Sequence, residues 1–435
     1  MTKFILSLSL SLLPVAAQAD LSAASLAQIS GATTGDNFAR QIKTGDLNGD
    51  GYDDLIIGTY GEATNGSQNG AVHIIYGNTT PISAASITDA ADATYVGEAL
   101  YDWAGMEVSA GDVNGDGYDD LLIAAFQNDG GATNGGAAYL VYGQADELSG
   151  GNLSTAIRFV GSTVDEFIGY DVAIVGDLNG DGYEEIMVGA PFNDENGADA
   201  GAVYVIYGRA QAFTSTTFAA FAGLASVIYG DAASNHLGNT VIPAGDVNND
   251  GYDDAIIGGD GIDLPATDAG AMYLIYGSAT VITNPSTASQ FVRFTGENEN
   301  DYLGYEATAL GDVNGDGYDD FLIACGFYSA NDNGAIYLFY GQSAQYTSGS
   351  VSQGTRITGL AVQDYFGQFV GSAGDVNADG YSDILVGAGY ADDAGDASGT
   401  AYLIHGQSSS FSAGAVTTLS PTLFTGEAAT QLLGH

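Results

Sequence analysis

Six short segments of the chain repeat one arrangement of oxygen-bearing residues, Asp-x-Asn-x-Asp-Gly-Tyr-x-Asp, with Glu as the last residue in one copy. Oxygens at positions 1, 3, 5 and 9 and a backbone carbonyl at position 7 follow the ligand order of an EF-hand calcium loop. The Gly at position 6 permits the sharp turn that wraps the chain round an ion. The bidentate Glu at position 12 of an EF-hand is missing, so these segments are a different kind of loop.

An all-oxygen donor set favours calcium over zinc or copper, so the sequence predicts about six Ca²⁺ sites. The candidate ligands are Asp46, Asn48, Asp50, Tyr52, Asp54, Asp112, Asn114, Asp116, Tyr118, Asp120, Asp177, Asn179, Asp181, Tyr183, Glu185, Asp246, Asn248, Asp250, Tyr252, Asp254, Asp312, Asn314, Asp316, Tyr318, Asp320, Asp375, Asn377, Asp379, Tyr381 and Asp383.

The six copies indicate which loop positions matter. Position 3 is always Asn and position 9 is always acidic, whereas position 8 is Ser382 in the last copy and position 4 varies. The alternative is a plain turn held by side-chain-to-backbone hydrogen bonds. Retention of an acid at position 9 in all six copies favours metal binding. The same comparison predicts that the position 8 side chain is not a ligand.

The loops recur every 63–69 residues, so the chain is one repeated unit. Each unit reads as four strands, with short β-branched and aromatic runs separated by Gly, Asn and Asp. Examples are 167–175, 121–125, 138–143 and 157–161 for the first to fourth strand. The wholly apolar second strand fits a position covered on both faces. This pattern predicts an all-β fold, a β-propeller of four-stranded blades; a β-solenoid is the alternative, but its coils are shorter.

The loop motif, Phe366-Gly367 before one loop and Gly189-Ala190-Pro191 after another resemble FG-GAP repeats, those of the integrin α-subunit propeller and of many bacterial surface proteins. The other units depart from the Phe-Gly and Gly-Ala-Pro signatures. The resemblance implies a seven-bladed propeller with calcium between the first two strands of a blade. The predicted domain covers 20–435. Its repeats are about 32–96, 97–161, 162–230, 231–296, 297–359 and 360–425, with a truncated seventh at 426–435.

Residues 1–19 are predicted to be a secretory signal peptide. Lys3 precedes an apolar run over 4–15, and Ala17-Gln18-Ala19 supplies a cleavage site. The run is shorter than a membrane anchor requires. Ser25–Gly31 reads as an orphan fourth strand of a seventh blade. We therefore expect six complete blades and a partial seventh, with seven blades in the complete protein. We also expect an exported protein of bacterial type whose signal peptide is cleaved.

Composition excludes several function classes. With 54 acidic against 7 basic residues, a net charge of −47 repels nucleic acid and anionic membranes. A single cysteine, Cys325, rules out a disulfide framework and reads as a buried thiol. His73, His236 and His405 replace aromatic residues of the repeat, which predicts packing. No catalytic motif is present, so we expect a protein that is not an enzyme.

The sequence thus predicts a calcium-binding, non-enzymatic binding or adhesion module, secreted or at the cell surface, with the periplasm as another location. Its partner would be an extracellular protein or glycan. The loops between the second and third strands vary most and would do the recognising, on the face opposite the calcium loops. They are 60–69, 126–135, 191–200, 259–269, 326–333 and 389–398. The alternatives are the propeller part of a secreted polysaccharide- or lipid-degrading enzyme and a structural surface-layer component.

Overall fold

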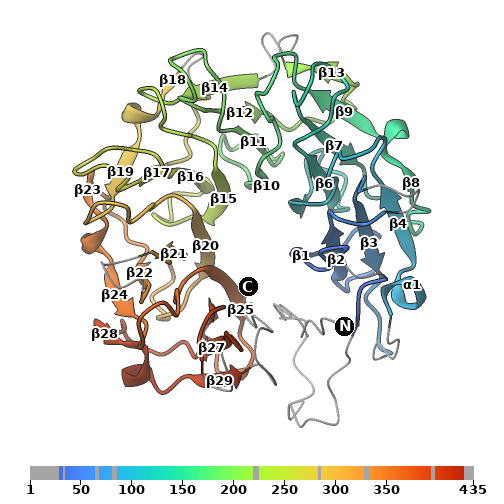
Figure 1. Cartoon of the computed structure of the whole chain (residues 1–435). Coiled ribbons are helices and arrows are strands. Elements are labelled where there is room, and N and C mark those ends of the chain that lie inside the picture. The colour runs from blue at the N-terminus through green and yellow to red at the C-terminus, as the bar shows by residue number, and fades with distance from the viewer. Residues whose placement is uncertain are drawn as a thin grey trace.

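The computed structural model describes residues 29–32, 35–63, 68–80, 86–218, 225–282, 286–327, 333–392 and 397–425. Its described strands form six sheets, each built on four antiparallel strands, that follow one another round a common centre (Figure 1). Each sheet contains four consecutive strands of one unit, so the predicted all-β propeller with six four-stranded blades is confirmed. The predicted signal peptide and the start of the seventh repeat lie outside the described residues.

In each blade the first strand lies nearest the centre in Figure 1, and the chain then runs outward. Blades 1 to 3 contain β1 Gln41–Gly45, β2 Asp54–Thr59, β3 Ala71–Ile75, β4 Ala93–Val96; β5 Val108–Gly111, β6 Asp120–Ala125, β7 Ala137–Val141, β9 Ile157–Val160; and β10 Val172–Ile174, β11 Ile186–Ala190, β12 Ala202–Ile206, β14 Ala225–Tyr229. Blades 4 to 6 contain β15 Thr240–Gly245, β16 Asp254–Gly259, β17 Ala271–Ile275, β19 Val292–Thr295; β20 Glu306–Gly311, β21 Asp320–Cys325, β22 Ala335–Phe339, β24 Thr355–Thr358; and β25 Phe369–Gly374, β26 Asp383–Ala388, β27 Thr400–Ile404, β29 Thr422–Thr425.

Helical structure in the described residues is confined to single turns in the Ser/Thr/Ala-rich stretches. These turns are α1 Ile87–Ala90 and the 3₁₀ turns Leu153–Thr155, Ala288–Gln290, Val351–Gln353 and Val416–Leu419. No helix within the described ranges is long and apolar enough to cross a membrane. Each turn contains one aliphatic or small residue that is buried, such as Ile87 or Leu153.

The core lies between neighbouring blades, which explains why the second strands are apolar throughout. Every residue of β6 is buried, and its Leu121 and Ile123 pack in one cluster with Ile56 of β2. A strand sandwiched by sheets on both sides has no face left for polar side chains. The apolar runs read from the sequence are therefore the contacts that hold one blade against the next.

Each of the first five blades gains a short fifth strand from the following unit. These strands are β8 Gly151–Asn152, β13 Thr216–Thr217, β18 Ser286–Thr287, β23 Gly349–Ser350 and β28 Gly414–Ala415. Each pairs in parallel with a fourth strand, as Val96 of β4 does with Asn152. Such pairing ties consecutive units together and was not predicted.

The N-terminal segment repeats this pairing one unit earlier. Ser30 forms a parallel bridge with Ser86, and Ser86 precedes α1 as Asn152 precedes its 3₁₀ turn. Ile29 beside it is buried. Ser30 therefore occupies the place of a fourth strand in a preceding blade, in agreement with the predicted orphan strand. A seventh blade itself stays a prediction.

The outer edge of blade 6 differs from the other five. Among the described strands, β29 has a partner on one side only, and all its residues are exposed, with Leu423 at 53%. An exposed apolar edge strand promotes association between chains. We expect the chain of residues 20–435 to self-associate with rising concentration, and Leu423→Lys to reduce this, as measured by sedimentation velocity.

A matched control is Val281→Lys, which changes an exposed apolar residue away from that edge. It should leave the association unchanged. A wild-type chain that is monomeric across the accessible concentration range would contradict the expectation that this edge is adhesive.

Candidate metal loops and the opposite loop face

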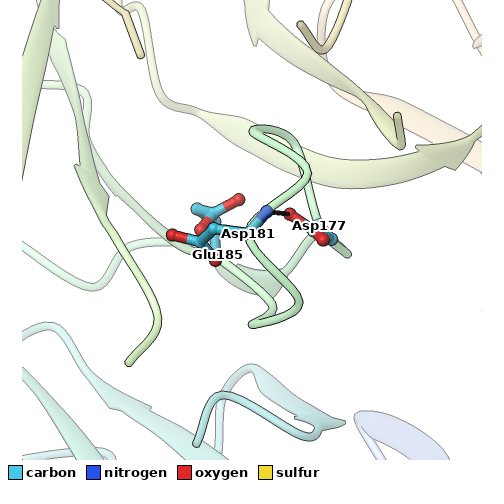
Figure 2. Close-up of side chains that lie close together, drawn as sticks. All are labelled: Asp177, Asp181 and Glu185. Atoms are coloured by element: carbon cyan, nitrogen blue, oxygen red, sulfur yellow. Dashed lines mark hydrogen bonds between the residues drawn. The ribbon is translucent and has the colours of Figure 1, made fainter. Parts of the chain in front are cut away.

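The six acidic loops connect the first and second strands of the blades. In the third loop, one carboxylate oxygen from each of Asp177, Asp181 and Glu185 lies within 4.8 Å of the others (Figure 2). The backbone N–H of Asp181 donates to Asp177 Oδ1 at 3.1 Å, which curls the loop round these oxygens. Within the described ranges, this is the loop that brings three acidic side chains so close together.

The fourth loop contains a buried oxygen without a hydrogen-bond partner. Asn248, at position 3, is 7% exposed, and its amide nitrogen donates to Asp250 Oδ2 at 3.0 Å. Its Oδ1 atom has no partner among the protein atoms. A buried acceptor left unpaired is costly, and a bound cation would satisfy it. The donor set of these loops therefore fits a hard divalent ion.

The same side chains also stabilise the turns directly. In the first loop, Asp46 Oδ2 accepts the N–H of Gly51 at 2.9 Å, and Asp50 Oδ1 accepts the N–H of Tyr52 at 2.9 Å. Equivalent bonds recur in the other loops. Because a carboxylate oxygen has two lone pairs, these bonds leave room for a metal. A loop can therefore be a turn held by its own hydrogen bonds and also bind a metal ion.

The position 9 acid is fully buried at the start of the second strand. Asp320 Oδ2 accepts the N–H of Val313 at 3.0 Å, and Oδ1 accepts that of Gly341 at 2.8 Å. This carboxylate therefore braces its own loop against the end of the third strand. The invariance of position 9 has this structural cause in addition to any role as a ligand.

Burial, together with the acids at positions 1 and 5, raises the pKa of the position 9 carboxyl in five loops. The pKa rises to about 7 for Asp54, Asp254 and Asp320 and to about 8 for Asp120 and Glu185. A buried carboxyl beside other acids is costly to ionise. A cation bound at the loop would lower that cost.

Position 8 has a role that the sequence comparison missed. Asp119 Oδ2 accepts the N–H of Asp46, the first residue of the preceding loop, at 2.8 Å, and Asp253 does the same for Asp177 at 2.8 Å. The glycine before each first aspartate makes room, because a Cβ on Gly176 would lie 2.4 Å from Asp253 Oδ2. Position 8 therefore links neighbouring loops, and the prediction that it is not a metal ligand stays a prediction.

Position 7 reaches the preceding loop as well. A Cβ on Gly180, at position 4, would lie 2.5 Å from the ring of Tyr252, and Gly180 has a φ of +74°. The residues that replace Gly at position 4, Asn249 and Ala378, also have positive φ, at 54° and 58°. Position 4 varies in residue type while its backbone conformation is kept.

The opposite end of the blades carries a nearly continuous series of aromatic contacts. It is built from the first or second residues of the second-to-third-strand loops and from the residues two positions before the glycine that precedes each first strand. Ring centroids lie 5.2–6.0 Å apart in the pairs Tyr60–Trp103, Trp103–Phe126, Phe126–Phe167, Phe167–Phe192, Phe192–His236, Tyr302–Phe327, Phe327–Tyr365 and Tyr365–Tyr390. Five of these pairs are edge-to-face and three are tilted, and such contacts stabilise the loop bases beyond their buried area.

Large apolar side chains project from the loops at this same end. Leu100 and Tyr101 are 62% and 56% exposed, and Val164, Val362 and Tyr390 are also exposed. In so acidic a protein, exposed apolar residues at one end make that end a candidate binding surface. Of these residues only Tyr390 lies in a predicted variable loop. The others lie in the connections from the fourth strand of one blade to the first strand of the next, which the sequence comparison did not single out.

His73, His236 and Cys325 are placed as packing residues, as predicted, whereas His405 is 38% exposed beside the sixth loop. His73 is buried, with Nε2 2.8 Å from Glu62 Oε2. His236 packs on Phe192 and pairs with Asp260 at 3.0 Å, a hydrogen bond that raises its pKa. Cys325 is buried, and its Sγ lies 3.2 Å from the carbonyl oxygen of Asp301.

Comparison with known proteins agrees with the repeat pattern. The FG-GAP repeat family matches residues 38–75, 104–141, 169–206, 304–339 and 366–404. Integrin alpha-5 of Xenopus laevis is 27% identical over 260 residues, 57% of this chain and 22% of that protein. Integrin alpha-6 of Gallus gallus is 30% identical over 193 residues, 44% of this chain and 16% of that protein. The chain thus spans about a fifth of the length of these relatives.

Among solved structures, an Agrocybe aegerita lectin that recognises non-reducing terminal N-acetylglucosamine aligns with a TM-score of 0.41 and 15% identity. That alignment covers 91% of this chain and 80% of the lectin chain. The matched repeats, the six-bladed all-β fold and the similarity to integrin α chains identify the chain as an FG-GAP repeat protein whose propeller resembles that of integrin α.

Proposed function

We propose that the chain is an exported, calcium-stabilised binding module that is not an enzyme. Its partner, an extracellular protein or glycan, would contact the end of the blades opposite the acidic loops. The observation that carries this proposal is the group of exposed apolar side chains at that end, including Leu100, Tyr101 and Val164. The similarity to integrin α chains supports a role in binding or adhesion at the cell surface.

Calcium and recognition would occupy opposite ends of the same blades. Position 9 of each loop, such as Asp120, starts the second strand, and the variable loop follows at the other end of that strand. A metal that fixes the loop at one end therefore stiffens the strands that carry the recognition loops. Rigid scaffolds with variable loops are a common arrangement for binding surfaces.

The enzyme alternative would need a pair of reactive carboxyls, and candidates lie at the inner strands. Burial raises the pKa of Asp171, and it raises that of Glu306 to about 8. However, Asp171 Oδ2 accepts the N–H of Val241 at 2.8 Å and Oδ1 accepts that of Val172 at 2.7 Å. Asp171 thus satisfies backbone groups of two neighbouring blades, which favours a structural role.

The proposal predicts that loss of apolar residues at the loop end abolishes binding without loss of fold. Beads coated with the protein would be tested on immobilised matrix proteins and a glycan array, in calcium and in EDTA. We expect Tyr101→Ser combined with Val164→Ser to reduce capture at least about tenfold, since a few anchor residues, tyrosine among them, carry most of the binding energy of an interface.

Val281→Ser is the matched control, because Val281 is exposed and apolar but lies outside those loops. It should bind as the wild type does. Equal capture by the double variant and the wild type would contradict this assignment of the binding surface.

A further inference from the structure

Among the described residues, the fourth strand of blade 6 is less covered than the fourth strands of the other five blades. The next-to-last residue of the fourth strand is at most 8% exposed in blades 1 to 5, where it is Tyr95, Phe159, Ile228, Phe294 and Ile357. The equivalent residue of β29, Phe424, is 40% exposed. The six places correspond, because each of these residues lies opposite the second residue of its third strand.

The cover in blades 1 to 5 comes from the following unit. Thr216 of β13 pairs in parallel with Phe159, and the ring of Phe218, just after β13, lies edge-on to the Phe159 ring with centroids 6.3 Å apart. In the other four blades the fourth-strand residue shares an apolar cluster with the buried residue of the next unit's single turn, which is Leu153, Ala288, Val351 or Val416. No described strand pairs with the outer side of β29, which leaves Phe424 exposed.

A sequence pattern marks the covering element. In three units its buried residue stands six positions before the buried residue of the unit's own fourth strand, in the pairs Leu153–Phe159, Ala288–Phe294 and Val351–Ile357. The residue before it is Asn, Thr or Ser. Asn152 and Ser350 cap their turns, because each side chain accepts the backbone N–H two residues on, at 3.0 and 3.1 Å. The two residues after the buried one are exposed.

The N-terminal segment carries the same pattern. Ile29 is buried beside the Ser30–Ser86 bridge, at the place of a fourth strand. Six positions before Ile29 stands Ala23, which is preceded by Ser22. Residues 21–28 lie outside the described residues, so this match is one of sequence. It identifies the segment that begins near residue 21 as a further copy of the covering element.

We propose that residues 21–24 dock on the free edge of β29 in the same molecule. Ser22 pairs in parallel with Thr425, in the register that joins β23 to β19, and Ala23 is buried against Phe424. The length of chain fits, since eight positions separate Ser22 from Ser30, as they separate each short strand from its own fourth strand in the pairs Asn152–Val160, Thr287–Thr295 and Ser350–Thr358. Blades 6 and 1 are the two ends of the series round the centre (Figure 1).

The docked segment would protect the edge that we expect to promote self-association. Proteins commonly cover an exposed edge strand so that it does not pair with another chain. A segment of the same chain acts at a high effective concentration, about millimolar for a short linker, so a second copy displaces it only as the protein concentration rises. The proposal requires neither bound calcium nor the binding surface at the loop end.

A disulfide tests the docking directly. Ser22→Cys with Thr425→Cys places two thiols on paired residues, and neighbouring strands bring Cα atoms within the roughly 4.4–6.8 Å that a disulfide spans. The matched control is Ser22→Cys with Thr358→Cys, the same strand position in blade 5, whose edge β28 already occupies. Both chains of residues 20–435 would be oxidised over a range of concentrations and analysed by non-reducing gels and peptide mass spectrometry.

We expect the first pair to form a disulfide within one chain at every concentration and the control pair to stay reduced. Cross-links only between two copies would overturn the proposal, because the segment would then bind a neighbour. Absence of any cross-link between positions 22 and 425 would overturn it as well.

A second pair of variants tests the protection of the edge. Ala23→Glu places a charge where the pattern requires a buried residue, so it should associate at a concentration at least about tenfold lower than the wild type in sedimentation velocity. Ala24→Glu is the control, because the equivalent residues Ser154 and Ser352 are exposed, and it should match the wild type. Equal association of Ala23→Glu and the wild type would show that the segment does not cover the edge.

Discussion

Calcium is expected to raise the melting temperature of the chain, and EDTA to reverse the rise. An ion that binds the folded loops but not the unfolded chain stabilises by mass action. Extracellular calcium modules have Kd values of about 10⁻⁴–10⁻³ M. At about 10 mM calcium, each such site contributes about 1.4–2.7 kcal/mol. Six sites in a chain of 435 residues would shift the melting temperature by about 10–20 °C, as measured by scanning calorimetry.

The pH dependence should change sign with the metal. Without calcium, burial holds the pKa of Asp120 and Glu185 at about 8, far above the values of an unfolded chain. The folded state then binds more protons than the unfolded state between about pH 4 and pH 8. Stability in EDTA should therefore fall as the pH rises through this window.

In calcium the trend should be opposite, because protons compete with the ion for the same carboxylates. Stability should rise between about pH 5 and pH 7 as the loops fill. Identical melting curves in calcium and EDTA, at every pH, would show that the loops are turns alone. Magnesium serves as a control, since it demands stricter octahedral geometry and should stabilise less.

The features that the sequence predicted are those whose causes are local to one repeat. The four strands of a unit follow from alternation of apolar runs and Gly/Asn/Asp turns, and the first-to-second-strand loops follow from one nine-residue motif. The orphan strand near Ile29 was also found, because its residues resemble those of β9 and its partner Ser86 lies in the analogous place. Each of these features can be found by comparing the copies of the repeat with one another, without the three-dimensional structure.

The features that the sequence missed arise between repeats. Asp119 accepts the backbone N–H of Asp46, which lies in the loop one unit earlier, and nothing in the linear pattern shows which loops are neighbours. A signal was present in the sequence, because a glycine precedes every first aspartate, and in the first five loops that glycine, such as Gly176, lies against the position 8 side chain of the next loop. The parallel fifth strands are only two residues long, too short for any periodicity to reveal them.

Isosteric substitutions at two adjacent acids should separate ligand from linker. Asp320→Asn should remove one calcium site and also destabilise the calcium-free chain. Both carboxylate oxygens of Asp320 accept backbone N–H groups, from Val313 and Gly341. An amide can accept only one of the two bonds and turns an N–H₂ group toward the other donor. Loss of a buried acceptor costs about 1–3 kcal/mol, measurable by calorimetry in EDTA.

Asp319→Asn should leave the number of calcium ions unchanged in isothermal titration. Its carboxylate accepts the N–H of Asp246 at 3.0 Å, and the amide oxygen of Asn can still accept that bond. Asp319→Ala removes the acceptor, so it should weaken the fourth loop, which begins at Asp246, and spare the fifth. If Asp319→Asn and Asp320→Asn each lost one ion, position 8 would be a ligand and the assigned ligand set would be wrong. If Asp319→Ala left all loops unchanged, the bond to Asp246 would carry no coupling between neighbouring blades.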